Sequence, residues 1–348
     1  MPSSFSTPTP CSPLVRLDAA IAAWREAGRL GIDFDVIEAP DWYAEGLLLA
    51  RFGKVPLVVH IHSPWHDPQP GVDSSSSRPS VIAGRIADWL ERSAARHSYL
   101  VTCPSHDMAR RLHARNWTGK VPTRARHHCV DLERWAAVAP VGQTGPVVAI
   151  VGTLQRLKGQ EVLVRAAGRL AREHPDIRVL CIGRSAESDG AGRPYSGYLE
   201  NLADHLGVTL ALPGAVGHDE LADLLGEVRV VAVCSHQETL SMAGLEAMAA
   251  GRPLVCTSST GIAEMVGVSG AGAVVPPGDP EALAAALRPY VADAGLAARV
   301  GAAGRAAVQR DCSEAAGGAE TEGVYATLAG SGRRMAFRTG RPAEITLR

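Results

Sequence analysis

Several residue types that mark particular protein classes are scarce in this 348-residue sequence. Aromatic residues make up 5% of it, and no apolar run approaches the roughly 18 residues that a membrane-spanning helix requires. The seven cysteines are odd in number and include no CxxC pair, which argues against a disulfide framework and fits a reducing compartment. Neither sign of charge is in excess, since 35 Lys and Arg oppose 36 Asp and Glu. We therefore expect a cytoplasmic protein with no membrane span and no nucleic-acid partner.

The length and composition favour about two domains with sizeable cores, because 46% of the residues are apolar. The first 13 residues contain no basic residue and no apolar stretch, so we expect a disordered lead-in and not a secretory signal. We expect the same of the arginine-rich tail, residues 331–348. Residues 137–146 are rich in Pro and Gly, which predicts a domain boundary near residue 142.

Apolar runs alternate with helix-period segments along both halves, which predicts α/β domains with parallel sheets. In the second half we expect six strands: residues 147–151, 178–182, 208–212, 228–234, 254–256 and 273–275. In the first half we expect strands at residues 34–37, 57–61, 99–103 and 123–127, and helices near 13–27, 43–51, 80–95 and 106–114. Ligands of such sheets bind beyond the carboxyl ends of the strands.

The segment Glu238–Pro253, ETLSMAGLEAMAAGRP, follows one of these buried strands. It places two glutamates, Glu238 and Glu246, eight residues apart around a helix that we expect to start near Ser241. A helix N-terminus favours a phosphate, and the two carboxylates could accept hydrogen bonds from sugar hydroxyls beside it. Alternatively, both are surface glutamates of an ordinary helix.

The segment Val151–Gln160, VGTLQRLKGQ, runs from another strand through a short loop to a helix start. Its lysine, Lys158, could bring a point charge to a phosphate at the same edge of the sheet. The spacing GxxxxGK[ST] is absent from the chain, so this loop is not a P-loop. The alternative is a solvated loop lysine.

Taken together, the pairing of GxLxxxKG with E-x7-E, followed by GRPLV and by the turn Gly261–Glu264, resembles glycosyltransferase family 4. The segments DFDVIEAPDW and PLVVHIHSPW also fit the acceptor domain of that family. The resemblance implies the GT-B fold: two Rossmann-like domains whose parallel sheets face a cleft. It places the acceptor-side domain at residues 1–142, the nucleotide-sugar domain at 143–312 and a helix that crosses back at 313–330.

The resemblance also implies a role for individual residues. Lys158 matches the lysine that binds the donor diphosphate, Glu238 matches a glutamate near the donor sugar, and His62 matches a histidine that contacts sugar or acceptor. Glu246 matches the glutamate that holds the ribose. The other positions assigned to the nucleotide sugar are Gly152, Thr153, Gly183, Arg184, Pro213, Val216, Leu240, Ser241 and Met242.

Three of these positions depart from the family pattern. Thr153 stands where the family has an arginine that Arg156 would have to replace, and Leu240-Ser241 replaces the usual Phe-Gly. The family also has about three strands before the DVIEAP strand, so the first domain is expected to be incomplete, with residues 34–37 as an exposed edge.

The activity implied by the resemblance is transfer of a sugar from a nucleoside diphosphate sugar to a hydroxyl acceptor, with retention of configuration. No metal and no cofactor is implied, because the nucleotide sugar is the donor substrate. The acceptor class stays open between a glycan, a lipid-linked compound and a small natural product. One alternative is a catalytically silent partner that stabilises or regulates another transferase.

Two short patterns suggest a metal instead. Asp33 and Asp35 form a DxD, which binds a metal in other transferases but here opens a strand. His60 and His62 have the HxH spacing of some metal hydrolases and lie on one face of their strand. No matching carboxylate pattern follows them, so a metal-dependent hydrolase is a remote alternative.

Overall fold

The computed structural model describes residues 13–62, 78–186 and 194–330. The expected disorder of the two ends falls outside these residues, apart from Pro13. The described residues divide into two compact units: residues 13–62, 78–126 and 318–330 form the first, and residues 127–186 and 194–317 form the second. The division falls after Arg126, earlier than the expected boundary near 142, and the last helix, α13 (Glu314–Ala329), contributes its larger part to the first unit.

The first unit contains a parallel sheet of four strands in the order β1-β2-β3-β4. The strands are β1 (Ile37–Pro40), β2 (Leu57–His60), β3 (Leu100–Cys103) and β4 (Thr123–Ala125). The main helices are α1 (Pro13–Arg29), α2 (Leu47–Phe52), α3 (Arg78–His97) and α4 (His106–Ala114). Among the described residues, β1 is an edge of this sheet, as we expected.

Two expectations for the first unit are wrong in detail. The first strand spans Ile37–Pro40 instead of residues 34–37, because its pairing begins at Ile37 opposite Leu57. Proline is tolerated at its end because the ladder uses the N–H groups of Ile37 and Asp41, on either side of Pro40. The helix expected at 43–51 starts later, at Leu47, because a left-handed turn intervenes.

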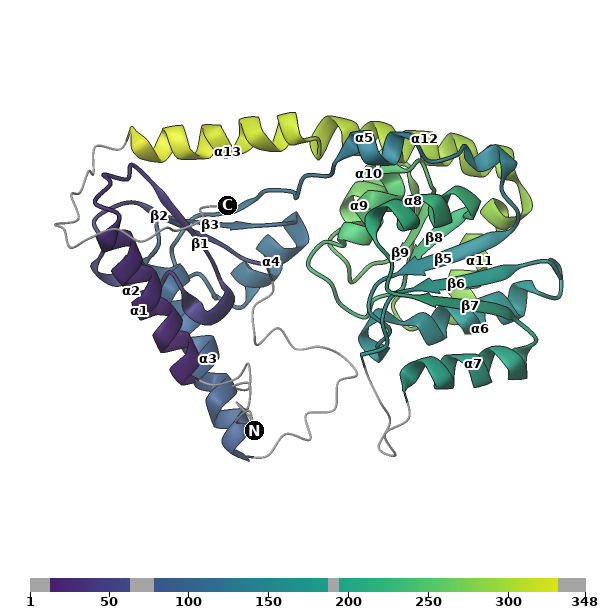
Figure 1. The fold of residues 1–348 in the computed structure, drawn as a ribbon, viewed down its shortest axis with the longest axis horizontal. Helices are drawn as coiled ribbons and strands as arrows, with labels where there is room; N and C mark the ends of the chain where they lie inside the picture. The colour runs from purple at the N-terminus through teal and green to yellow at the C-terminus, as the bar shows by residue number, and fades with distance from the viewer. Residues whose placement is uncertain (1–12, 63–77, 187–193, 331–348) are drawn as a thin grey trace, which may run out of the picture. The chain divides into compact units, whose positions relative to one another are not determined.

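The second unit contains a parallel sheet of six strands in the order β10-β9-β8-β5-β6-β7, which confirms the α/β class (Figure 1). The strands are β5 (Val147–Val151), β6 (Arg178–Ile182), β7 (Thr209–Gly214), β8 (Val230–Val233), β9 (Leu254–Thr257) and β10 (Gly272–Val275). From β5 the chain adds β6 and β7 on one side and then returns to add β8, β9 and β10 on the other. The strand order therefore reverses between β5 and β8, and in open α/β sheets ligands bind at such a point.

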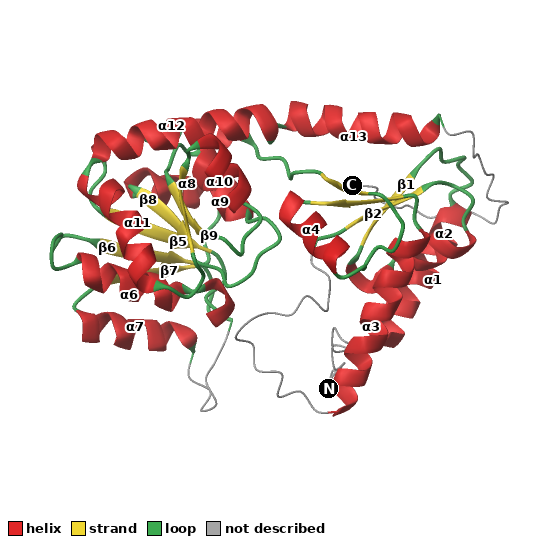
Figure 2. Ribbon diagram, turned by 180° about the vertical axis from the view of Figure 1, so that it is seen from behind, coloured by secondary structure: helices red, strands yellow, loops and turns green. Residues whose placement is uncertain are grey.

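Helices cover both faces of the larger sheet, as Figure 2 shows in red around the yellow strands. One face packs against α6 (Gln160–Leu170), α7 (Tyr195–Leu206) and α11 (Pro280–Ala292). The other packs against α5 (Leu132–Ala136), α8 (His218–Glu227), α9 (Met242–Ala249), α10 (Ala263–Ser269) and α12 (Ala294–Asp311). Alternate residues of β5 serve the two cores, with Val148 in one and Ala149 in the other, as a strand buried on both faces requires. None of the described helices combines the length and apolarity needed to cross a membrane.

Candidate active site

Glycines join the carboxyl ends of three neighbouring strands in the second unit. The N–H of Gly152, after β5, donates to the Ile182 carbonyl at 2.8 Å, and that of Gly183, after β6, donates to the Gly214 carbonyl at 2.8 Å. Gly152 and Gly183 have φ values of 144° and 151°, and a Cβ atom on Gly183 would collide with the Gly152 carbonyl oxygen. Only glycine permits this approach, so the sheet edge presents bare backbone at the predicted positions Gly152 and Gly183.

The loop after β5 carries Lys158 in a tight turn of fixed shape. Gly159 ends this turn with φ of 69°, and a Cβ atom there would collide with the Cys234 carbonyl oxygen after β8. The Gln160 amide donates to the Thr153 carbonyl at 2.9 Å and so closes the loop from the helix side. The structure buries Gln160, which the sequence reasoning missed; its only sequence signal is its place directly after Lys158-Gly159 at the helix start.

Lys158 and Glu238 form an ion pair at the point where the strand order reverses. The Lys158 Nζ lies 2.8 Å from Glu238 Oε1, and the side chains are 25% and 18% exposed. The Ser235 hydroxyl donates to the other carboxylate oxygen at 2.8 Å. The two residues are eighty positions apart in the chain, and they meet because β5 and β8 are neighbours in the sheet. Ser235 was missed by the sequence reasoning; its only signal is its place directly after a buried strand.

The N-terminus of α9 follows Glu238 after a strained residue. Ser241 has φ of 109°, a conformation that favours glycine, and its hydroxyl caps the helix by accepting the Gly244 N–H at 3.2 Å. Leu240 before it is buried, and Met242 after it is 41% exposed. The helix N-terminus at Met242 therefore reaches the surface at this edge of the sheet.

Glu246 lies one turn into α9 and is largely buried. Burial raises the pKa of its carboxyl above the ordinary value, and the nearby His218 and Arg134 oppose that rise. The His218 Nε2, at the start of α8, lies 3.9 Å from Glu246 Oε1. Water therefore solvates the charge of the Glu246 carboxylate only weakly.

The remaining predicted residues of the second unit differ in exposure. Arg184 and Pro213 are exposed after β6 and near the end of β7, and Val216 packs partly buried against the core beside α8. Thr153 is half-buried, and its carbonyl accepts from Gln160.

Arg156, the suggested replacement for the family arginine, faces helix α7. Its guanidinium lies 5.4 Å from the ring centre of Tyr195 and 5.3 Å from that of Tyr198. The Tyr195 hydroxyl donates to Glu161 at 3.0 Å, and the same carboxylate lies 3.5 Å from Arg156. These contacts hold the loop of Lys158 against α7.

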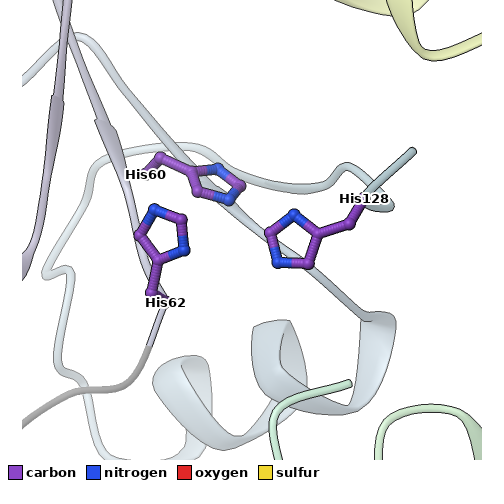
Figure 3. Close-up of side chains that lie close together, drawn as sticks. All are labelled: His60, His62 and His128. Carbon is purple, nitrogen blue, oxygen red and sulfur yellow. The ribbon is translucent and has the colours of Figure 1, made fainter. Parts of the chain in front are cut away.

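In the first unit, His62 follows β2 beside the ring of His60 (Figure 3). Its N–H donates to Asp41 Oδ1 at 2.9 Å, and its ring meets that of His60 edge to face at 4.6 Å between centroids. Burial lowers the pKa of His62 below its ordinary value. The charge of Glu38 opposes this shift, and the charge of Arg126 adds to it, both by smaller amounts. His62 is therefore a neutral imidazole near pH 7. His128, also drawn in Figure 3, belongs to the second unit.

His60 takes part in a buried polar network. Its Nδ1 lies 3.2 Å from the Arg126 guanidinium and 2.7 Å from the Thr102 hydroxyl. Arg126 in turn binds Glu38 at 2.6 Å, and the Tyr325 hydroxyl of α13 donates to the same carboxylate at 3.0 Å. A guanidinium on His60 Nδ1 blocks that nitrogen and repels a cation, which weakens the interpretation of His60 and His62 as a metal site.

Two sequence families match this chain. Residues 132–307 match the family described as glycosyl transferases group 1, and residues 2–134 match glycosyltransferase family 4. Glycogen synthase of Mycobacterium tuberculosis (strain ATCC 25618 / H37Rv) is 31% identical over 305 residues, which are 85% of this chain and 70% of that protein. D-inositol 3-phosphate glycosyltransferase 1 of Catenulispora acidiphila is 31% identical over 279 residues, 75% of this chain and 65% of that protein.

Solved structures resemble the fold at lower identity. Sucrose-phosphate synthase from Thermosynechococcus elongatus superposes with a TM-score of 0.70 and 23% identity over 86% of this chain and 74% of that one. Anabaena Alr3699/HepE in complex with UDP-glucose gives a TM-score of 0.68 and 20% identity over 90% and 82% of the two chains.

Proposed function

This chain belongs to the glycosyl transferases of group 1, in glycosyltransferase family 4, and from that premise we propose that it moves a sugar from a nucleoside diphosphate sugar to a hydroxyl acceptor with retention of configuration. The second unit binds the donor. The first unit binds the acceptor, with His62 in contact with the sugar or the acceptor.

One observation carries the donor assignment. At the point where the strand order reverses, the chain brings together the Lys158 ammonium, the Glu238 carboxylate and the N-terminus of α9. Backbone N–H groups of a helix N-terminus and a lysine ammonium both attract phosphate oxygens. A diphosphate in this position would compete with Glu238 for Lys158, and Glu246 would accept hydrogen bonds from the ribose.

The proposed mechanism requires stabilisation of the leaving group above all. As the bond between sugar and diphosphate breaks, negative charge grows on the leaving phosphate while the acceptor hydroxyl attacks from the same face and passes its proton to a leaving phosphate oxygen. Lys158 and the N–H groups at the start of α9 stabilise that charge. This chain's own groups supply that positive potential, so the mechanism as proposed is independent of a metal.

Donor binding and turnover by the full chain test the proposal. We expect calorimetric titration with UDP-, GDP-, ADP- and TDP-glucose to detect binding of at least one of them, with UDP-glucose tested first because the Anabaena protein of similar fold is described in complex with it. Glu246→Ala should weaken binding, whereas Glu200→Ala, on an exposed glutamate of the same unit, should not. Binding of none of the four by the folded protein would refute the donor assignment.

Turnover separates the enzyme from the silent-partner alternative. An enzyme releases nucleoside diphosphate slowly from its donor even in water, and faster with an acceptor. A silent partner would bind the donor and release nothing. The departures Thr153 and Ser241 at the donor site are the observations that favour this second candidate.

A further inference from the structure

The turn after β1 has a backbone that side chains rarely adopt. Tyr43 and Ala44 are consecutive non-glycine residues with φ of 55° and 52°. Such residues persist where the surrounding structure holds them, and they cluster at functional sites. The Asp41 N–H donates to the His60 carbonyl at 2.9 Å, and the Asp41 carbonyl accepts the Ala44 N–H at 3.2 Å.

Neighbouring helices hold this turn in place. The Tyr43 ring lies under the Arg16 guanidinium of α1, 5.8 Å from its centre. Arg16 is itself fixed by a buried ion pair with Glu91 of α3, at 3.0 Å with both side chains 3% exposed. Ala44 is buried beneath the turn. The strained backbone is thus held from the helix side as well as by the strand.

The result of this arrangement is an indole ring held open to solvent. Trp42 is 52% exposed, yet its ring is fixed against the His62 imidazole, with 4.8 Å between centroids and 36° between planes. Both residues follow neighbouring parallel strands, whose ends pair as Pro40 with His60. The Asp41 side chain joins them by accepting the His62 N–H.

We propose that Trp42 and His62 form a stacking platform for a pyranose ring, so that the acceptor of this protein is a carbohydrate. This inference rests on the proposed function and names the class of its acceptor. A pyranose has a face of C–H groups with partial positive charge, and an aromatic face carries negative charge in its quadrupole. The hydroxyl groups at the edge of the pyranose need hydrogen-bonding partners beside the aromatic ring, whereas an apolar lipid needs none.

The residues around Trp42 supply the hydrogen-bonding groups that a carbohydrate needs. His62 is neutral near pH 7, so one ring nitrogen donates and the other accepts a hydrogen bond. Glu45, at the end of the same turn, has a pKa raised by burial and offers carboxyl oxygens. Polar groups beside a single exposed indole fit a sugar, whereas a lipid chain would need a continuous apolar surface.

Binding of a glycan array by the full chain tests the platform. The array presents gluco-, galacto- and manno-configured oligosaccharides, and the chain is compared with Trp42→Ala, Trp42→Phe and Trp89→Ala. Trp89 is the matched control, because it is a tryptophan 64% exposed on α3 of the same unit. We expect at least one glycan to bind, Trp42→Ala to lose about ten-fold in affinity, Trp42→Phe to retain most of it and Trp89→Ala to be unchanged.

Tryptophan fluorescence supplies a second measurement, which would not change on glycan binding if the role of Trp42 were only structural. Titration with the bound glycan should change the emission of the native chain and of Trp89→Ala but not that of Trp42→Phe. Thermal melting of the three variants verifies that they fold. The platform is overturned if no glycan binds, if Trp42→Ala binds as the native chain does, or if Trp42→Ala and Trp89→Ala lose affinity equally.

Donor titration distinguishes this failure from failure of the proposed function. We expect Trp42→Ala to bind the nucleoside diphosphate sugar as the native chain does. Donor binding and turnover without any glycan binding would overturn the platform and leave the transferase in place. Glycan binding through Trp42 without donor binding would support the platform and refute the donor assignment.

Discussion

The charge on Lys158 should act on the rate of the reaction more than on donor binding. Its Nζ is paired with Glu238 at 2.8 Å, so a carboxylate already partly compensates its positive charge. The net free energy that Lys158 contributes to binding of the donor in the ground state is therefore small. This contribution increases in the transition state, where the leaving diphosphate acquires charge and the Lys158–phosphate attraction exceeds the Lys158–Glu238 attraction.

We expect Lys158→Ala to lower kcat by about 10²- to 10³-fold, which corresponds to about 2.7–4 kcal/mol of lost transition-state stabilisation. The substitution also leaves the negative charge of the Glu238 carboxylate beside the phosphate without the Lys158 ammonium, which adds repulsion in the same direction. Glu246→Ala should behave differently, because the ribose does not change during the reaction. Loss of hydrogen bonds to this carboxylate, about 1.5–3 kcal/mol, should raise the donor KM about 10- to 100-fold at nearly constant kcat.

Steady-state rates of nucleoside diphosphate release, measured across donor concentrations, separate the two effects. The exposed residues Lys120 and Glu200 supply matched control variants, Lys120→Ala and Glu200→Ala, which should change neither constant. Thermal melting establishes that each variant is folded. If Lys158→Ala changed only KM, or if Glu246→Ala abolished turnover at saturating donor, the assignment of charge to Lys158 and ribose to Glu246 would be wrong.

Three further predictions concern stability. In urea unfolding, Ser241→Gly should raise the free energy of unfolding by about 1 kcal/mol, because glycine relieves the backbone strain at φ of 109°. Ser241→Ala keeps that strain and loses the helix cap, so it should lower the free energy of unfolding by about 1 kcal/mol. Glu91→Ala should destabilise the first unit by about 3 kcal/mol because it leaves the Arg16 charge buried, while the double variant Arg16→Met/Glu91→Leu should melt near the native temperature. Glu246→Gln should raise the melting temperature at pH 7. The folded state has the higher pKa at Glu246, so the native chain loses stability as the pH rises above about 4.5, the pKa of the unfolded state. Below that pH the difference in melting temperature between native chain and variant should vanish.

Each of these has a result that contradicts it. Equal effects of glycine and alanine at Ser241 would show that the φ value there is not strained. A double variant as unstable as Glu91→Ala would show that packing around Arg16, and not its charge, is responsible. A stability difference for Glu246→Gln that persists unchanged at pH 4 would remove burial of the charge as its cause.

The second unit was predictable from the sequence because the four inner strands of its sheet, β5, β6, β8 and β9, are buried on both faces. These strands read as nearly continuous apolar runs, such as Val147–Val151, and helix-period segments separate them along the chain. These runs located all six strands to within a few residues. The shorter strands of the first unit carry a weaker pattern, and the alternation in residues 33–37 placed β1 three residues too early.

The turn that carries Trp42 could not be predicted from residue type. Left-handed backbone is normally signalled by Gly or Asn, and here it occurs at Tyr43 and Ala44. What holds it is the Arg16 guanidinium of α1 and the His60 carbonyl, which accepts the Asp41 N–H, and both are tertiary contacts. Local preference therefore favoured a helix at this place, and the surrounding structure overrode it.

The meeting of Lys158 with Glu238 depends on strand order and not on either segment alone. Each segment could be found in the sequence, but an equally regular α/β chain whose strands were added on one side only would put β8 far from β5 and separate the two charges. In this chain the reversal makes β5 and β8 neighbours, so the loops that follow them converge. Because the pair occupies the ammonium until a strongly charged anion competes for it, a donor that lacks the second phosphate should react much more slowly than a nucleoside diphosphate sugar.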